Sequence, residues 1–427
     1  MATVQKNSAL EEFQANADRM MGTYDRLKAR GAKGSEVYFW EGMANYYQRV
    51  TDAAKEGRSV LCCGMFVPHE LFAGMDIPYY IAENHGVMTF QSDMEQGMNL
   101  FDTAERAGMA ADICSPHRAA TGLALLGRTL QPQAVVHTAT TCDQTIQLYQ
   151  VLADIHNVPS FIVDTPYGAR PADITYAKEN MKELIAFLEQ QFNTKLDPTK
   201  LRERIEISCE AYSYWEKICE LRKAVPCPTG GREAVKDTTI LLVAAGREES
   251  VNYYKARYEE LKEKVDKGEG IIPNEKHRLA WLYVLPFFDL KMADWLQDTY
   301  GAVIVLDTFG INNPEITLKP DDYLTFLAEK PLKRRFTHWS FAPSKESQAV
   351  DGLAQLCRDF NADAAVLLSH WSCQQWCGLT QMLRDKITKD LGIPFLTVNG
   401  DLLDPRVVSS EDMRSNMAEF FTAVMGE

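Results

Sequence analysis

Apolar residues along this chain occur in short continuous runs that alternate with longer stretches in which they recur every three or four positions. Ser59–Gly64, Ile77–Ile81 and Ala365–Leu368 have the length of buried strands, and many of the intervening stretches have amphipathic helical spacing. Strands that alternate with helices form parallel sheets covered by helices. We therefore expect an α/β fold with two doubly wound, flavodoxin-like or Rossmann-like parallel-sheet domains.

One unit of this pattern occurs twice. Ala134–Asp164 and Ala365–Asp401 each contain an apolar strand, a loop with a cysteine (Cys142 or Cys373), an amphipathic helix, a Val-Pro or Ile-Pro pair and a second strand. The second copy has four more residues between the cysteine and the proline, about one helical turn. A cysteine at the start of a helix is near the positive end of the helix dipole, which favours its thiolate. It also lies at the carboxyl end of a strand, where ligands bind such sheets.

The same pattern divides the chain into four segments. We expect an N-terminal helical segment over 1–57, a first α/β domain over 58–172, a helical connector and hinge over 173–237, and a second α/β domain over 238–427 that closes with a C-terminal helix. The second domain is expected to begin with a strand at Thr239–Ala244.

Composition narrows the class of protein. A chain of 427 residues is too long for one ordinary core, which agrees with two domains. The net charge of −14 argues against nucleic acid as the main partner, because there is no basic surplus to replace counterions. We see no apolar run near 20 residues and no apolar signal-peptide core at the N-terminus. We therefore expect a cytoplasmic protein without a membrane span.

Of the ten cysteines, seven separate into two groups. In a reducing compartment they are expected to be buried thiols or metal ligands rather than disulfides. Those in helical or strand patterns fit the apolar core: Cys62, Cys209, Cys219 and Cys357. Cys114, Cys142 and Cys373 lie instead at loop-to-helix junctions with polar neighbours. Three such thiolates suit an iron–sulfur cluster with one open iron position, or a zinc ion with an open position, and spacing alone does not choose between them.

Several common catalytic motifs are absent from the sequence. The sequence contains no GxxxxGK[ST], no GxGxxG after a strand, no GxSxG and no HExxH, so the chain is not expected to bind ATP through a P-loop. Glu70 and His69 follow Pro68 at a predicted helix start beyond the first strand, and they are our candidates for proton transfer. The alternative for Glu70 is a carboxylate that only compensates the helix dipole.

From about Val60 to its end, the chain resembles the large subunits of 2-hydroxyacyl-CoA dehydratases and of ATP-dependent benzoyl-CoA reductase. The motifs that carry the resemblance are VPHEL (67–71), AENHG (82–86), AERAGMAADIC (104–114), TTC (140–142), HNVPSFIVDTPY (156–167), EKHR (275–278), SHWSCQQW (369–376) and LGIPFLTVNGDLLDPR (391–406). The AENHG and DPR stretches are most similar to the alpha-type subunit of the heterodimer.

The resemblance implies a 4Fe–4S cluster held by Cys114, Cys142 and Cys373, with the fourth iron position left for water or the substrate thioester oxygen. A related branch with a double-cubane cluster needs a further cysteine between the first two, which this chain lacks. Gln374 and Trp376 depart from the family pattern, which leaves the substrate side chain open.

The implied reaction removes water from a 2-hydroxyacyl-CoA to give an enoyl-CoA, in anaerobic metabolism. One electron makes a ketyl radical that expels the hydroxyl group. The implied partners are a homologous second subunit and a separate ATP-hydrolysing iron–sulfur activator, which agrees with the missing P-loop.

Alternatives remain open at this point. Within the family, the same cluster could serve a benzoyl-CoA reductase subunit that reduces an aromatic ring. The chain could also be a non-catalytic partner or electron-relay subunit. A zinc-dependent lyase or a thiol-based binding protein would use the same cysteines with different metal content.

Overall fold

The protein is described by a computed structural model that covers residues 2–139, 142–166, 170–311, 322–333 and 348–426, the side chains of residues 2–7, 348 and 349 excepted. The chain forms two compact units. The first comprises Met1–Tyr214, Thr239–Arg257 and Pro314–Thr337, and the second comprises Trp215–Thr238, Tyr258–Asn313 and His338–Glu427.

The first unit is built on a parallel sheet in the order β2-β1-β3-β4. Its strands are β1 Leu61–Cys63, β2 Tyr79–Ile81, β3 Ala134–Thr138 and β4 Ser160–Val163. Cys63 pairs with Ile81 on one side and with Val136 on the other, so all carboxyl ends meet at one edge. The strand order changes direction between β1 and β3, and this kind of switch point is where such sheets bind ligands.

The second unit repeats this topology. Its strands are β5 His277–Leu282, β6 Ala302–Asp307, β7 Ala364–His370 and β8 Phe395–Gly400, all parallel in the order β6-β5-β7-β8. The switch point therefore lies between β5 and β7. In the first sheet, the repeated sequence unit corresponds to β3, helix α7 (Asp143–His156) and β4. In the second it corresponds to β7, helix α16 (Gln374–Lys386) and β8, so the predicted pair of doubly wound parallel sheets is confirmed.

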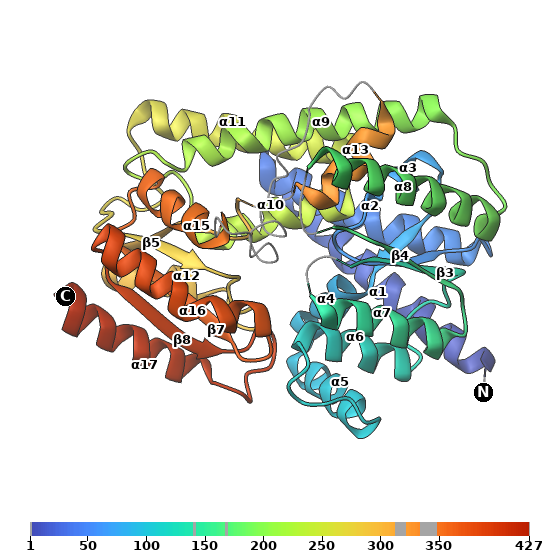
Figure 1. Ribbon diagram of the computed structural model, residues 1–427, viewed down its shortest axis with the longest axis horizontal. Helices are drawn as coiled ribbons and strands as arrows, with labels where there is room; N and C mark the ends of the chain where they lie inside the picture. The colour runs from blue at the N-terminus through green and yellow to red at the C-terminus, as the bar shows by residue number, and fades with distance from the viewer. Residues whose placement is uncertain (1, 140–141, 167–169, 312–321, 334–347, 427) are drawn as a thin grey trace. The chain divides into compact units, whose positions relative to one another are not determined.

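Helices surround both sheets (Figure 1). Those of the first unit are α1 Ala2–Ala29, α2 Ser35–Lys55, α3 His69–Gly74, α4 Ala82–Ser92, α5 Met94–Arg106, α6 Ser115–Leu125, α7 Asp143–His156, α8 Pro171–Phe192 and α13 Tyr323–Leu332. Three helices have residues in both units: α9 Pro198–Leu221, α10 Gly231–Val243 and α11 Glu248–Lys267. Those of the second unit are α12 Met292–Tyr300, α15 Gln348–Asp359, α16 Gln374–Lys386, α17 Ser410–Phe420 and the π-helical turns η1 Ile387–Leu391 and η2 Phe421–Met425.

Each sheet is covered by helices of its own unit. In the second unit, α12 packs on β6. Helix α16 packs on β7 and α17 packs on β8 (Figure 1). All six residues of β6 are buried, as expected for a parallel strand with both faces covered. In the first unit, α7 packs on β3 and β4.

One predicted element is wrong. Thr239–Ala244 was expected to be a strand, but Gly231–Val243 forms helix α10. Ile240–Ala244 are all buried, and a short apolar run that is covered on every side has the same pattern in a helix and in a strand. Periodicity therefore could not distinguish the two.

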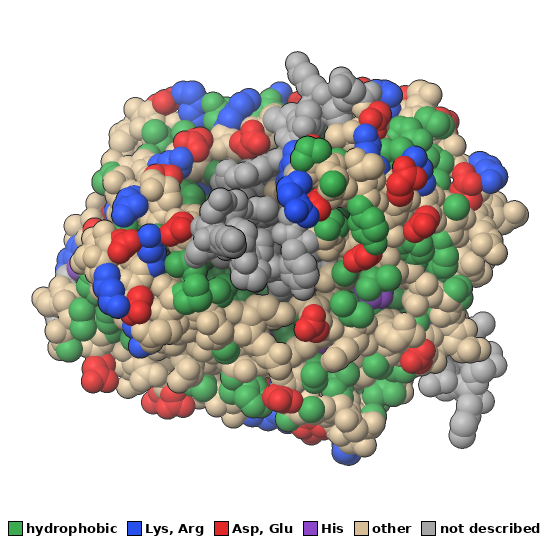
Figure 2. Space-filling model, viewed as in Figure 1, with side chains coloured by type: hydrophobic (Ala, Val, Ile, Leu, Met, Phe, Trp, Pro, Cys, Tyr) green, Lys and Arg blue, Asp and Glu red, His purple; other side chains and the backbone are tan. Residues whose placement is uncertain are grey.

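The surface carries charged side chains of both signs. Figure 2 shows Lys and Arg side chains interspersed with Asp and Glu side chains over the face in view. Among the described residues, every helix is too short or too polar to cross a bilayer.

Candidate functional site

Each of the three candidate cysteines caps the N-terminus of a helix. Cys114 is the N-cap of α6, Cys142 of α7 and Cys373 of α16. Their thiols are partly exposed, whereas six other cysteines are buried: Cys62, Cys63, Cys209, Cys219, Cys227 and Cys357. The predicted separation between core cysteines and helix-start cysteines is therefore visible in their burial.

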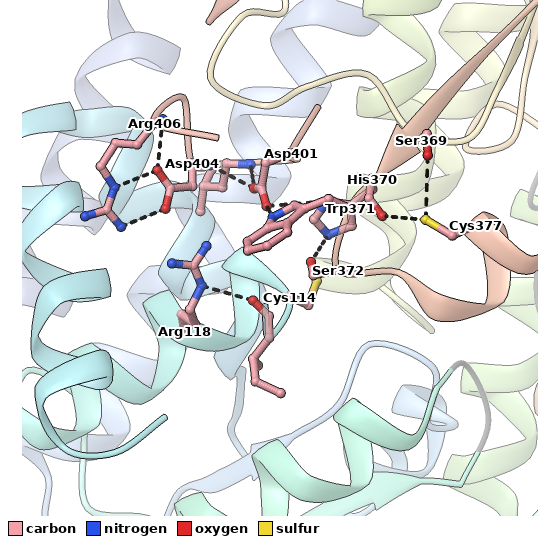
Figure 3. Close-up of polar contacts among 12 residues, drawn as sticks. Cys114, Arg118, Ser369, His370, Trp371, Ser372, Cys377, Asp401, Asp404 and Arg406 are labelled. Carbon is pink, nitrogen blue, oxygen red and sulfur yellow. Dashed lines mark hydrogen bonds and ion pairs between the residues drawn. The ribbon is translucent and has the colours of Figure 1, made fainter. Parts of the chain in front are cut away.

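Cys377 is the fourth partly exposed cysteine. It lies one turn into α16, where its Sγ is 3.3 Å from the carbonyl oxygen of His370 and 3.6 Å from Oγ of Ser369 (Figure 3). A sulfur with these contacts packs against the end of β7. This makes Cys377 a matched control for Cys373 within the same helix.

The first unit holds Cys114 and Cys142 on neighbouring helices. The backbone N–H of Cys114 donates to Oε1 of Gln144 at 2.8 Å, and Gln144 is the second residue of the helix that Cys142 caps. Helices α6 and α7 also pack together. The structure therefore joins two cysteine loops that are separated by 28 residues in the sequence. Thr140 and Thr141 of the TTC motif lie outside the described residues.

Cys373 sits in the second unit, immediately beyond β7. Its backbone N–H donates to the carbonyl oxygen of His370 at 2.8 Å, which forms the turn into α16. Burial raises the pKa of the Cys373 thiol, and the backbone N–H groups of Trp376 and Gln375 oppose that rise. The helix start thus acts in the predicted direction, but the effect of burial on the Cys373 pKa is the larger one. A bound metal reverses this balance, because a coordinating thiol is deprotonated.

A buried polar cluster supports the turn that carries Cys373 (Figure 3). His370 Nε2 lies 2.9 Å from Oγ of Ser372, and its Nδ1 lies 3.5 Å from Oδ2 of Asp401. Asp401 also accepts a hydrogen bond from Nε1 of Trp371 at 2.9 Å and from the backbone N–H groups of Leu403 and Asp404. Because His370 and Asp401 are fully buried and Ser372 nearly so, these contacts hold residues 370–373 in one conformation.

Glu70 is placed in the interior of the first unit. Its Oε2 lies 2.6 Å from Nζ of Lys330 on α13, and its Oε1 accepts a hydrogen bond from Ser208 at 2.8 Å. The side chains of Glu70 and Lys330 are 0% and 1% exposed. A buried ion pair with both oxygens of Glu70 occupied holds α13 to α3.

His69 is also fully buried. Its Nε2 lies 3.1 Å from the carbonyl oxygen of Gly64, and its ring stacks on Tyr79 at 5.0 Å. Glu70 and His69 therefore both start α3, as predicted, and both contact the protein interior. Their role in proton transfer stays a prediction.

Glu83 is a carboxyl group that sequence reasoning missed. It follows β2 at the start of α4 and is 4% exposed. Burial raises its pKa to about 7, which outweighs the opposing hydrogen bond with Tyr149. The AENHG motif was the available signal, because it places a carboxylate directly beyond a strand, where ligands bind.

The contacts of Tyr149 explain how a neutral Glu83 is accommodated. The Tyr149 hydroxyl lies 2.6 Å from the carbonyl oxygen of Cys63 and also contacts the Glu83 carboxyl. A phenol has one hydrogen to donate. If the Tyr149 hydroxyl donates to the Cys63 carbonyl oxygen, a protonated Glu83 can donate to the phenol oxygen. All three groups then have a hydrogen-bond partner. The ring of Tyr149 stacks on His137 at 5.4 Å, at the same edge of the sheet.

The candidate metal donors are the three helix-start cysteines. No three His, Cys, Asp or Glu side chains are grouped to hold a metal ion within the part of the chain that the structure describes. Cys114 and Cys142 belong to one unit and Cys373 to the other, so the three-cysteine ligand set stays a prediction. The donors themselves fit an iron–sulfur cluster: three partly exposed thiols, each followed by helix N–H groups that can donate to sulfur.

Comparison with known proteins gives one family and several relatives. Residues 64–423 match the family model described as 2-hydroxyglutaryl-CoA dehydratase, D-component. The chain is 24% identical over 418 residues to the (R)-phenyllactyl-CoA dehydratase alpha subunit of Clostridium sporogenes, covering 94% of this chain and 97% of that protein. It is 23% identical to the (R)-2-hydroxyisocaproyl-CoA dehydratase alpha subunit of Clostridioides difficile, covering 92% of this chain and 95% of that protein. It is also 23% identical to a benzoyl-CoA reductase subunit of Thauera aromatica, covering 90% of this chain and 93% of that protein. The resemblance seen in the motifs is confirmed.

Proposed function

We propose that this chain, which belongs to the 2-hydroxyglutaryl-CoA dehydratase D-component family, is the iron–sulfur subunit of a lyase that removes water from a 2-hydroxyacyl-CoA to give an enoyl-CoA. The observation that carries the proposal is the set of three partly exposed cysteines, each capping a helix at a loop-to-helix junction. Two of them follow the equivalent strands β3 and β7 of the two sheets. Relatives that match over nearly the whole chain are dehydratase alpha subunits.

Cys114, Cys142 and Cys373 would hold the cofactor, a 4Fe–4S cluster. When bound, such a cluster supplies one-electron and Lewis-acid chemistry. The protein's own contribution is to present the thiols. Gln144 fixes the backbone of Cys114, and the His370–Asp401 pair with Ser372 fixes the turn before Cys373.

Glu83 is the group best suited to hold or release a proton. A carboxyl with a pKa near the working pH is the most effective acid or base, and burial gives Glu83 a pKa of about 7. Tyr149 orients it, and it lies at the carboxyl edge of the first sheet. Glu70 and His69 are the further candidates, and Glu70 would have to leave its contact with Lys330 to reach a substrate.

The partners follow from the same proposal. The dehydratase relatives are named as alpha subunits, so a homologous second subunit would complete the enzyme as a heterodimer. The chain has no P-loop, so the electron that makes the β-proton acidic would come from a separate ATP-hydrolysing activator.

The test is a substrate comparison with anaerobically purified protein, its second subunit and its activator. We expect ATP-dependent formation of an enoyl-CoA from one or more 2-hydroxyacyl-CoA thioesters. Ring reduction of benzoyl-CoA without dehydration would instead favour the reductase, which the relative from Thauera aromatica makes the second candidate. Turnover of neither class by iron-loaded protein would leave an electron-relay or partner role.

A further inference from the structure

Three arginines of the first unit meet at the connection between α10 and α11, residues 244–247. Arg49 of α2 donates from Nη1 to Oε1 of Glu249 at 2.9 Å, and from Nη2 to the carbonyl oxygen of the last α10 residue at 3.1 Å. Arg204 of α9 donates from Nη1 to the carbonyl oxygen of Gly246 at 3.4 Å. Arg247 is the last residue of the connection itself. These three residues, Arg49, Arg204 and Arg247, form the arginine cluster.

The side chain of Arg247 has no acceptor. Within the part of the chain that the structure describes, its guanidinium group forms neither a hydrogen bond nor an ion pair, and its Nε is buried. The Nε of Arg204 is also buried without a partner among the described residues. Both residues are partly exposed overall, so a solute can reach them. A guanidinium group cannot lose its proton to escape burial, so unpaired donors here cost free energy.

The charges at the cluster do not balance. Glu249 already accepts from Arg49 and from an amide of α2 at 3.1 Å. Glu248 is exposed and forms no ion pair with any described residue. Three guanidinium groups against these two carboxylates leave a positive surplus, in a chain whose net charge is −14. Burial and the positive charges of the other two arginines lower the pKa of Arg247 to about 10, which agrees with a missing anion.

Backbone contacts hold the connection in place. Gly246 has a φ of 67°, and a Cβ there would lie 3.0 Å from Cβ of Arg204, so glycine allows α9 to come this close. The Gly246 N–H donates to Oγ of Ser208 at 2.9 Å, and Ser208 donates to Glu70. Because Glu70 is paired with Lys330, this carboxylate does not neutralise the arginines. The arginine cluster is therefore supported from the interior and lacks an anion.

We propose that the arginine cluster binds a phosphate group, which either coenzyme A or inorganic phosphate could supply. Planar guanidinium groups donate in pairs to phosphate oxygens, and these charge-assisted hydrogen bonds are stronger than neutral ones. A bound phosphate would give Arg247 its acceptor and would offset the positive surplus. The inference does not depend on the proposed function, because it requires neither iron nor turnover.

The experiment measures the binding of inorganic phosphate and of coenzyme A to the full chain by isothermal titration calorimetry, at constant ionic strength. Arg247→Gln and Arg204→Gln each remove one guanidinium group from the cluster. Arg202→Gln is the matched control, because Arg202 is an exposed residue of the same helix as Arg204 and its substitution removes the same charge.

We expect the wild-type protein to bind at least one of the two probes. Arg247→Gln and Arg204→Gln should each weaken that binding by about tenfold or more, whereas Arg202→Gln should keep it. Weakened binding of coenzyme A would identify the thioester substrate as the source of the phosphate, and weakened binding of inorganic phosphate alone would identify the free anion. The inference is overturned if the wild type binds neither probe, if Arg247→Gln binds as the wild type does, or if the control loses as much affinity.

Urea unfolding gives a second measurement, which a purely structural role of Arg247 would not reproduce. In phosphate-free chloride buffer, Arg247→Gln should be at least as stable as the wild type, because Arg247 has no partner among the described residues. In phosphate buffer of the same ionic strength, the wild type should gain stability through binding and the variant should not. Loss of stability or of folding in phosphate-free Arg247→Gln would overturn the inference. Iron content and turnover enter neither measurement, so such a failure leaves the proposed function standing.

Discussion

Substitution of Glu83 by glutamine provides a pH-dependent test of the buried carboxyl. Glutamine resembles the protonated acid in shape, and its amide can donate to the Tyr149 oxygen as the neutral carboxyl does. It cannot ionise, so it removes the titration and keeps the packing. In the wild type, burial holds the pKa of Glu83 at about 7, against an ordinary value of 4.5.

The sign and size of the expected stability change follow from this difference in pKa. The folded state binds the proton more tightly than the unfolded state, so the stability that the neutral carboxyl confers is fully present below pH 4.5 and is lost as the pH rises through about 7. One pKa unit corresponds to about 1.36 kcal/mol, so the wild type should lose about 3 kcal/mol relative to Glu83→Gln across that range. The variant should therefore be the more stable protein at about pH 8.

Urea unfolding of both proteins at several values between about pH 5 and pH 8 measures this difference. Glu210→Gln is the control for replacing a carboxylate by an amide, because Glu210 is an exposed residue of α9. A Glu83→Gln difference that stays constant within about 0.5 kcal/mol would refute a raised pKa at Glu83. It would also remove the reason for assigning proton transfer to this residue.

Three further predictions concern contacts within one unit. Lys330→Met should destabilise the protein by about 3–5 kcal/mol in urea unfolding, because Glu70 stays buried without its cation, and the double variant with Glu70→Met should recover much of that loss. A Lys330→Met cost below about 1 kcal/mol would contradict a buried ion pair. Tyr283→Gly should be more stable than Tyr283→Ala by about 1 kcal/mol, because glycine adopts the φ of 96° found at this position without strain. In an ordinary strand, alanine is the more stable of the two. A more stable Tyr283→Ala would therefore show that the backbone strain is absent. Gln144→Ala should cost about 1 kcal/mol of stability by freeing the Cys114 N–H, whereas Gln144→Glu keeps an acceptor and should cost less.

The sequence predicted the features that have a local pattern. The strand–cysteine–helix unit around Cys142 and its repeat around Cys373 could be read directly, because apolar periodicity and a helix start are properties of neighbouring residues. The same reasoning failed at Thr239–Ala244, where a buried helix and a buried strand share one apolar pattern.

The features that were missed depend on residues far apart in the chain. Lys330 lies 260 residues from its partner Glu70, so the ion pair has no local sequence signal. Tyr283 occurs in an apolar stretch without a nearby glycine to indicate a positive φ. The raised pKa of Glu83 likewise follows from burial, which the sequence does not state.

The most direct test of the account is the iron and acid-labile sulfide content of anaerobically purified protein, compared with its Cys373→Ala and Cys377→Ala variants. Three cysteine ligands to one cubane predict about four irons and four sulfides per chain in the wild type. Cys377→Ala should keep that content, because its sulfur packs against the end of β7, whereas Cys373→Ala should lose it with the fold intact. Full iron content in Cys373→Ala, or iron-free wild-type protein, would contradict the central claim that the helix-capping cysteines hold a cluster.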